Sequence, residues 1–121
     1  MTTSAAIIAV AIIAQHFFFD WILQPRWVAV NKSKNYLALL SHGLIVTVGF
    51  SAVAFFVCSI WTTAIAISLL YGVLHMVQDK IVWGTYKPET ENPYQEKSFW
   101  NRIAYDQFIH LTVAVLLLTR I

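Results

Sequence analysis

Four long apolar stretches alternate with short polar ones along this chain. A membrane-spanning helix needs about 20 mainly apolar residues. The first stretch ends before Pro25, a residue type that disfavours helix in the residue preceding it. No Asp, Glu, Lys or Arg occurs between Asn35 and Gln78, a length that fits two helices joined by a tight turn. The predicted helices cover residues 5–24, 36–58, 63–83 and 99–119.

The short links predict an all-α, antiparallel four-helix bundle in the membrane, formed as a single domain by residues 1–121. The segments 25–35 and 84–98, with the helix ends beside them, hold all lysines and arginines except Arg120. Because basic residues concentrate in cytoplasmic loops, both segments are predicted to be cytoplasmic and both termini to lie outside.

Composition supports membrane insertion. The chain is 59% hydrophobic and 12% charged, whereas soluble domains have about 25% charged residues. A net charge of +2 is too small and too dispersed for nucleic-acid binding. Cys58 is the only cysteine, which excludes an intrachain disulfide. The N-terminus lacks the basic segment of a signal peptide, so the first apolar stretch is interpreted as a retained helix.

Histidines and aspartates recur at helical spacing inside the apolar stretches. Each predicted helix has one histidine: His16, His42, His75 and His110. Three of them have an aspartate four residues away, in HFFFD (His16, Asp20), HMVQD (His75, Asp79) and DQFIH (Asp106, His110). Residues at this spacing share one helix face, so each pair projects together.

The order within each pair follows the direction of its helix. Histidine precedes aspartate in the two helices that run inward and follows it in the helix that runs outward. In all three pairs the histidine therefore lies one turn, about 6 Å, deeper than its aspartate, with His42 near the aspartate level. The sequence thus predicts one site assembled by the whole bundle.

Imidazoles and carboxylates are good ligands for first-row cations. The predicted metal ligands are His16, Asp20, His42, His75, Asp79, Asp106 and His110. One tetrahedral zinc needs four, so seven ligands suggest two ions. Zinc is favoured, with iron or manganese as alternatives and one ion as the simpler case. Gln24 lies one turn beyond Asp20 on the same helix face and is a candidate to orient a metal ligand. In helix two the position equivalent to an aspartate is Ala38, whose small side chain leaves a coordination place for water or substrate. The alternatives are a polar network that only joins the helices, or a proton relay.

Other polar residues receive structural interpretations. Gln78 and Gln107 point about 100° away from the neighbouring aspartates and are expected to contact solvent or another helix. Lys32 and Lys34 are read as orientation signals, with attraction of an anionic lipid headgroup as the alternative.

The ordered motifs also resemble a known family. They are HFFFDWILQ, a following Trp, NKSKN, the histidine that opens helix two, HMVQDK and DQFIHL. They are similar to those of small bacterial and phage membrane proteins known as domain of unknown function 3307. The resemblance implies four-helix topology, location in a bacterial inner membrane or as a phage-encoded membrane protein, and the same polar residues, but no activity. Locally, paired HxxxD segments are also similar to the zinc site of cation diffusion facilitators.

Three functional hypotheses follow. The favoured one is a metal-dependent intramembrane hydrolase of a lipid-like phosphoester or ester, with Asp79 or Asp106 accepting a proton. The second is a divalent-cation or proton transporter acting as a homo-oligomer. The third is a structural or phage-assembly subunit with a structural metal. The outer helix halves have no Asp, Glu, Lys or His, which disfavours transport. The expected partners are the lipid bilayer and a lipid substrate.

Overall fold

The computed structural model describes residues 3–119, and these contain helices, turns and loops with no β-strand. The elements are α1 (Thr3–Phe17), the π-helical turn η1 (Phe18–Ile22), α2 (Arg26–Asn31), α3 (Tyr36–Val57), α4 (Trp61–Gly84), the 3-10 turn η2 (Pro93–Gln95) and α5 (Lys97–Thr119). The prediction of an all-α four-helix bundle is confirmed. The remaining residues of the predicted 1–121 domain, including Arg120, lie outside the described residues.

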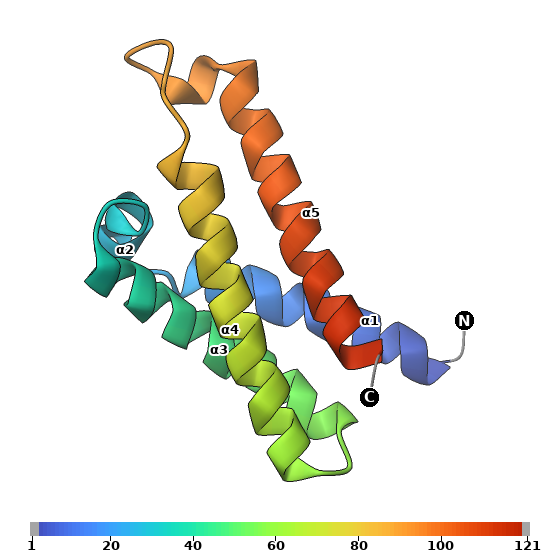
Figure 1. Cartoon of the computed structure of the whole chain (residues 1–121). Helices are drawn as coiled ribbons and strands as arrows, with labels where there is room; N and C mark the ends of the chain where they lie inside the picture. The colour runs from blue at the N-terminus through green and yellow to red at the C-terminus, as the bar shows by residue number, and fades with distance from the viewer. Residues whose placement is uncertain (1–2, 120–121) are drawn as a thin grey trace.

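The four long helices surround one central space. α1 packs against α3 and α5, and α4 packs against the same two helices. In Figure 1, α1 crosses behind α4 and α5, the α3–α4 turn lies at the bottom, and the α4–α5 loop lies at the top. The start of α1 and the end of α5 lie near each other at the right. Polar side chains that project inward from all four helices can therefore meet.

Polar and apolar side chains are distributed as expected for a bundle in lipid. Four helical segments are long and apolar enough to cross a membrane: Ser4–Ile22, Tyr36–Val57, Trp61–Gly84 and Lys97–Thr119. Large apolar side chains face outward, among them Val10 at 66% exposure and Phe56 at 78%. Every histidine and aspartate is buried. Water would penalise this outward apolar surface, whereas lipid accommodates it.

The first span ends at Ile22, two residues before Gln24, the end predicted from the sequence. The chain closes a π-helical turn at Ile22, bends, and enters α2 after Pro25, whose backbone is extended. The sequence predicts only a polar connector over residues 25–35, so α2 is an unpredicted helix. Asn35 then caps α3, because its side chain accepts hydrogen bonds from the N–H groups of Leu37 and Ala38.

Close contact between α3 and α4 fixes the register of their polar residues. A Cβ on Gly72 would collide with the Thr47 hydroxyl and lie 3.3 Å from the Gly43 carbonyl oxygen, so glycine permits the close approach. Nearby, the Phe50 and Tyr71 rings stack with centroids 4.2 Å apart.

An apolar core fills the bundle on one side of the histidines. Its buried members are Ile12, Val46, Phe50, Val53, Ala54, Ala64, Tyr71, Ala114 and Leu118. Along each helix, these core residues lie farther than the histidine from α2 and from the α4–α5 loop. The polar cluster therefore lies toward the α2 end of the bundle.

Candidate metal centre

The histidines and aspartates selected from the sequence meet at the centre of the bundle. α1 and η1 contribute His16 and Asp20, α3 contributes His42, α4 contributes His75 and Asp79, and α5 contributes Asp106 and His110. Each is 4% exposed or less. Charged groups at such depth usually serve a function.

His42 lies where three of the four helices contribute ligand atoms. Its Nε2 atom is 3.0 Å from Asp20 Oδ1, 2.9 Å from Asp79 Oδ2 and 3.0 Å from His75 Nε2. A ring nitrogen holds at most one proton, so it can donate only one hydrogen bond to these neighbours. Lone pairs that converge on one point in this way are suited to a shared cation.

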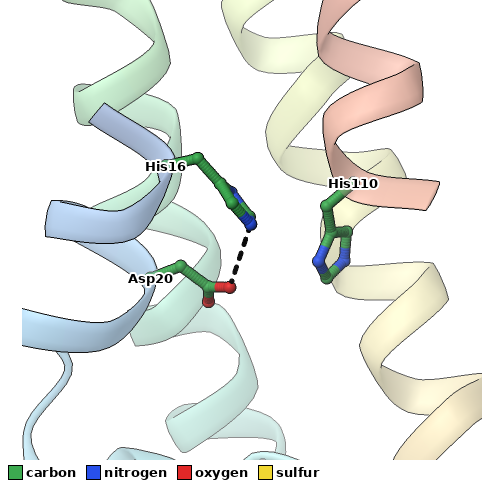
Figure 2. Close-up of side chains that lie close together, drawn as sticks. All are labelled: His16, Asp20 and His110. Carbon is green, nitrogen blue, oxygen red and sulfur yellow. Dashed lines mark ion pairs between the residues drawn. The ribbon is translucent and has the colours of Figure 1, made fainter. Parts of the chain in front are cut away.

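His110 and His16 complete the cluster from the other side. The His110 ring stacks on that of His75, with centroids 3.6 Å apart and planes 5° from parallel. Its Nε2 is 3.6 Å from Asp79 Oδ1. Figure 2 shows His16 and Asp20 facing His110 across the bundle, with His16 Nε2 3.5 Å from Asp20 Oδ2.

Six of these residues form three overlapping triads, in each of which the potential ligand atoms lie within 4.8 Å of one another. The triads are His16–Asp20–His110, Asp20–His42–His75 and His75–Asp79–His110. We call these six residues the ligand group. Zinc ligands at 2.0–2.1 Å in a tetrahedron lie about 3.3 Å apart, and the contacts of His42 and His75 with the two aspartates span 2.9–3.8 Å. The donor set and its spacing therefore fit a divalent cation.

Asp20 lies in an unusual backbone segment. η1 closes with a hydrogen bond from the Leu23 N–H to the Phe18 carbonyl, 2.9 Å long, which spans one residue more than an α-helical bond. π-turns are rare and often occur at functional sites. This widened turn carries the buried Asp20 carboxylate into the ligand group.

Asp106 lies beside the ligand group rather than within one of its triads. Its Oδ1 is 3.8 Å from His110 Nε2. Its carboxylate accepts hydrogen bonds from Gln78 Nε2 at 3.4 Å, Trp83 Nε1 at 3.4 Å and Gln107 Nε2 at 3.3 Å. These donors fix the carboxylate at the edge of the cluster.

Gln107 has a larger role than the sequence suggested. Its Oε1 lies 2.7 Å from His16 Nε2 and accepts from Trp21 Nε1 at 3.2 Å, while its Nε2 also donates to Asp20 at 3.3 Å. The prediction that Gln107 contacts another helix is confirmed, since its side chain reaches α1, but the same amide also donates to the neighbouring Asp106. Only the α1–α5 packing, which the sequence does not reveal, identifies it as a residue that orients two ligand residues.

Lys32 is the other residue whose role was missed. Its Nζ is 2.9 Å from Asp79 Oδ2 and 3.4 Å from His42 Nε2, and its side chain is 12% exposed. Burial alone would lower the pKa of this ammonium, but attraction by Asp79 and Asp20 outweighs burial and raises the pKa. The ligand group is therefore paired with a cation from the chain itself, a contact that the two expected roles of Lys32, as an orientation signal or in attracting an anionic lipid headgroup, do not include.

A cleft of about 560 Å³ opens onto the cluster from the α2 end. Asp20, Gln24, Lys32, Asp106 and Gln107 give it a polar lining, and residues of both polar connections complete it. These two connections therefore lie at the same end of the bundle. Gln24 lines this cleft, and its Oε1 is buried without a hydrogen-bond partner among residues 3–119, so this oxygen orients none of the ligand group.

The α4–α5 loop covers part of the cleft and is organised by Glu96, which is 7% exposed. The Glu96 carboxylate accepts hydrogen bonds from the Thr90 hydroxyl and N–H at 2.8 and 2.7 Å, from the Tyr86 hydroxyl at 2.9 Å and from the Glu89 N–H at 2.9 Å. Burial alone would raise the pKa of Glu96, but these hydrogen bonds outweigh it and lower the pKa.

The fold and the cluster define a class: small α-helical proteins with four potential membrane spans around a buried histidine–aspartate group. Sequence comparison then identifies the family. The chain belongs to the family described as a protein of unknown function, DUF3307, which matches residues 8–121, so the predicted resemblance is confirmed. The chain matches no curated protein and no solved structure.

Proposed function

We propose that this chain is a metal-dependent membrane hydrolase that cleaves a phosphoester or ester of a lipid-like substrate. The observation that supports it is the ligand group: six buried ligand residues from four helices, arranged in triads of metal-binding spacing. A structural zinc needs four ligands. A larger set beside an open cleft is better suited to a reaction.

The triads also suggest how two cations would be arranged. An imidazole normally gives one nitrogen to one cation, whereas a carboxylate can bridge two. The triads His16–Asp20–His110 and Asp20–His42–His75 share only Asp20, so both can be filled together. The third triad shares a histidine with each of them. Asp20 is therefore the proposed bridging ligand, with zinc favoured over iron and manganese.

Asp106 is the proposed general base. A divalent cation would polarise the phosphoryl or acyl oxygen and activate water. Asp106 lines the cleft, lies outside the triads and is held by three N–H donors. It can accept a proton from water as the water oxygen bonds to phosphorus or carbon, and the bond to the leaving alcohol breaks. That alcohol then takes up a proton. Asp79, close to His42 and Lys32, is better placed as a ligand or charge partner.

The apolar core favours hydrolysis over transport. All four helices contribute to this core, which lies between the ligand group and the far end of the bundle. A cation crossing it would lack polar ligands and face a barrier of several kcal/mol or more. The cleft gives the site access from the α2 end.

Elemental analysis of detergent-purified protein tests the metal site. We expect at least one divalent cation per chain in the wild type, loss of metal in Asp20→Asn, and normal content in the exposed control Glu91→Gln. If the wild type, purified without chelator and supplied with zinc, iron and manganese, retains none of them, the proposal fails.

Turnover tests the reaction separately. We expect metal-dependent hydrolysis of at least one member of a panel of phospholipids and acyl esters. Asp106→Asn should keep the metal and lose about 10²–10⁴-fold in kcat. Full metal occupancy with no turnover on any substrate class would leave a metal site and refute the hydrolase. Loss of metal in Asp106→Asn would make Asp106 a ligand.

A further inference from the structure

The cleft combines a charged floor with an aromatic wall. Lys32, Asp20 and Asp106 line its inner part, while Trp21, Trp83, Tyr94, Phe99 and Ile103 form much of its wall. Its volume of about 560 Å³ lies within the range of small-molecule sites. A ligand that fits these surroundings has a compact polar group at one end and an apolar body at the other.

The wall continues to the outer surface of the bundle. Trp21 is 48% exposed and Tyr94 is 68% exposed, although both line the cleft. Trp and Tyr are enriched where a membrane meets water. An apolar chain that leaves the cleft between such residues would enter the surrounding lipid, which favours a membrane amphiphile over a soluble metabolite.

Lys32 determines the sign of the charge that the ligand's polar group should carry. In the structure its ammonium is paired with Asp79, which also belongs to the ligand group. A divalent cation in the Asp20–His42–His75 triad would lie beside Asp79, because the Asp79 carboxylate is 2.9 Å from His42 Nε2. It would repel the Lys32 ammonium and compete with it for this carboxylate. Lys32, which also lines the cleft, would then need an anion. Phosphate groups are suited to this role because they offer several strong acceptors.

We propose that the cleft binds a phosphate-bearing amphiphile, with Lys32 moving from Asp79 to the phosphate and the aromatic wall holding the start of the apolar chain. This inference rests on the proposed function, because the bound phosphate would be the group presented to the cations. It also predicts reciprocal coupling: metal binding strengthens phosphate binding, and phosphate strengthens metal binding by the same factor.

Three probes separate the contributions of phosphate and apolar chain. They are a phosphonate analogue of dihexanoyl phosphatidic acid, which cannot be hydrolysed at its P–C bond, dihexanoylglycerol, which lacks the phosphate, and glycerol phosphate, which lacks the chains. Calorimetric titration of detergent-solubilised protein should show the phosphonate binding at least about tenfold more tightly than either partial ligand. Equal binding of dihexanoylglycerol would refute phosphate recognition. Equal binding of glycerol phosphate would refute the role of the aromatic wall.

Substitution of Lys32 tests its assigned contact. Lys32→Met should lose at least about tenfold in phosphonate affinity but retain or gain affinity for zinc, because the competing ammonium is gone. Lys32→Arg should retain most of the phosphonate binding. Lys87→Met is the matched control, since this exposed lysine lies at the same end and does not line the cleft. Equal phosphonate affinity in Lys32→Met and wild type would overturn the proposal, as would a matching loss of zinc affinity.

Metal content, measured on the same samples, distinguishes this inference from the proposed function. If the protein holds no metal, the hydrolase proposal fails, while the comparison of probes and of Lys32→Met still decides whether the cleft recognises a phosphate amphiphile. If metal is present and the phosphonate binds no better than dihexanoylglycerol, the cleft proposal fails and the metal site stands.

Discussion

Removal of the Asp79 charge should destabilise the metal-free protein strongly. Asp79 is fully buried, and its carboxylate lies 2.9 Å from the Lys32 ammonium. At an effective dielectric constant of about 20, this distance corresponds to a gross attraction of about 6 kcal/mol. Removing one partner of a buried pair costs about 3–5 kcal/mol, because the other charge remains buried. We therefore expect Asp79→Asn to lower the free energy of unfolding by about 3–5 kcal/mol in chelator.

A double-mutant cycle separates the ion pair from other effects of the substitution. Lys32→Met should also destabilise the metal-free protein, because it leaves Asp79 without its cation. The double variant Asp79→Asn/Lys32→Met should be more stable than the two single effects predict, by several kcal/mol. If the two substitutions are additive in chelator, the Lys32–Asp79 pair contributes nothing to stability and the reasoning is wrong.

The same cycle reports on the metal. With zinc present, a cation at the ligand group supplies positive charge to Asp79, so Lys32→Met should become much less destabilising and the coupling energy should fall. The measurement is unfolding by sodium dodecyl sulphate in mixed micelles, followed by tryptophan fluorescence with chelator and with zinc. A coupling energy that zinc leaves unchanged would contradict metal binding beside Asp79.

Three further predictions test packing, the loop and metal-linked stability. Gly72→Ala should lower the free energy of unfolding by about 1–3 kcal/mol, because the added Cβ collides with Thr47. Gly84→Ala is the control, because its Cβ would meet only a flexible lysine carbon at 3.9 Å. Unfolding in detergent compares the two variants. Glu96→Gln should lower the melting temperature at pH 7, and by progressively less as the pH is lowered from about 4.5 to 2. The Glu96 pKa is depressed, so its stabilisation is complete above about pH 4.5 and is lost as pH falls through the folded-state pKa. A difference that is unchanged between these pH values would contradict the role of the charged carboxylate. Zinc at 100 times its Kd should stabilise the wild type by about 2.7 kcal/mol and His75→Ala by much less; equal stabilisation of both would place the zinc elsewhere.

The sequence predicted the helical architecture because its main determinant is local. A span needs a fixed length of apolar residues, and charges are absent across the whole of α3 and most of α4. The pairing of histidines with aspartates was also readable, because a spacing of four residues places both on one helix face. The metal-binding and catalytic roles of these residues remain predictions.

The missed features depend on which helices are neighbours. Lys32 reaches Asp79 only because α2 folds back toward the bundle, and no local pattern distinguishes it from Lys34, which is exposed. Gln107 contacts His16 because α5 lies beside α1. The π-turn around Asp20 replaces an ordinary helical turn, a change of one residue in hydrogen-bond register that apolar periodicity does not encode.

The charge of the buried cluster links the cations to the substrate. With neutral histidines, the three carboxylates and the Lys32 ammonium leave two negative charges in a low-dielectric interior. One divalent cation cancels them. A second would leave two positive charges, which a doubly charged phosphate group in the cleft would cancel in turn. We infer that the first cation binds to the protein alone, whereas the second binds tightly only together with an anionic ligand. Metal titration should therefore give one ion per chain without the phosphonate and two with it; two tight ions in the absence of any anion would contradict this charge balance.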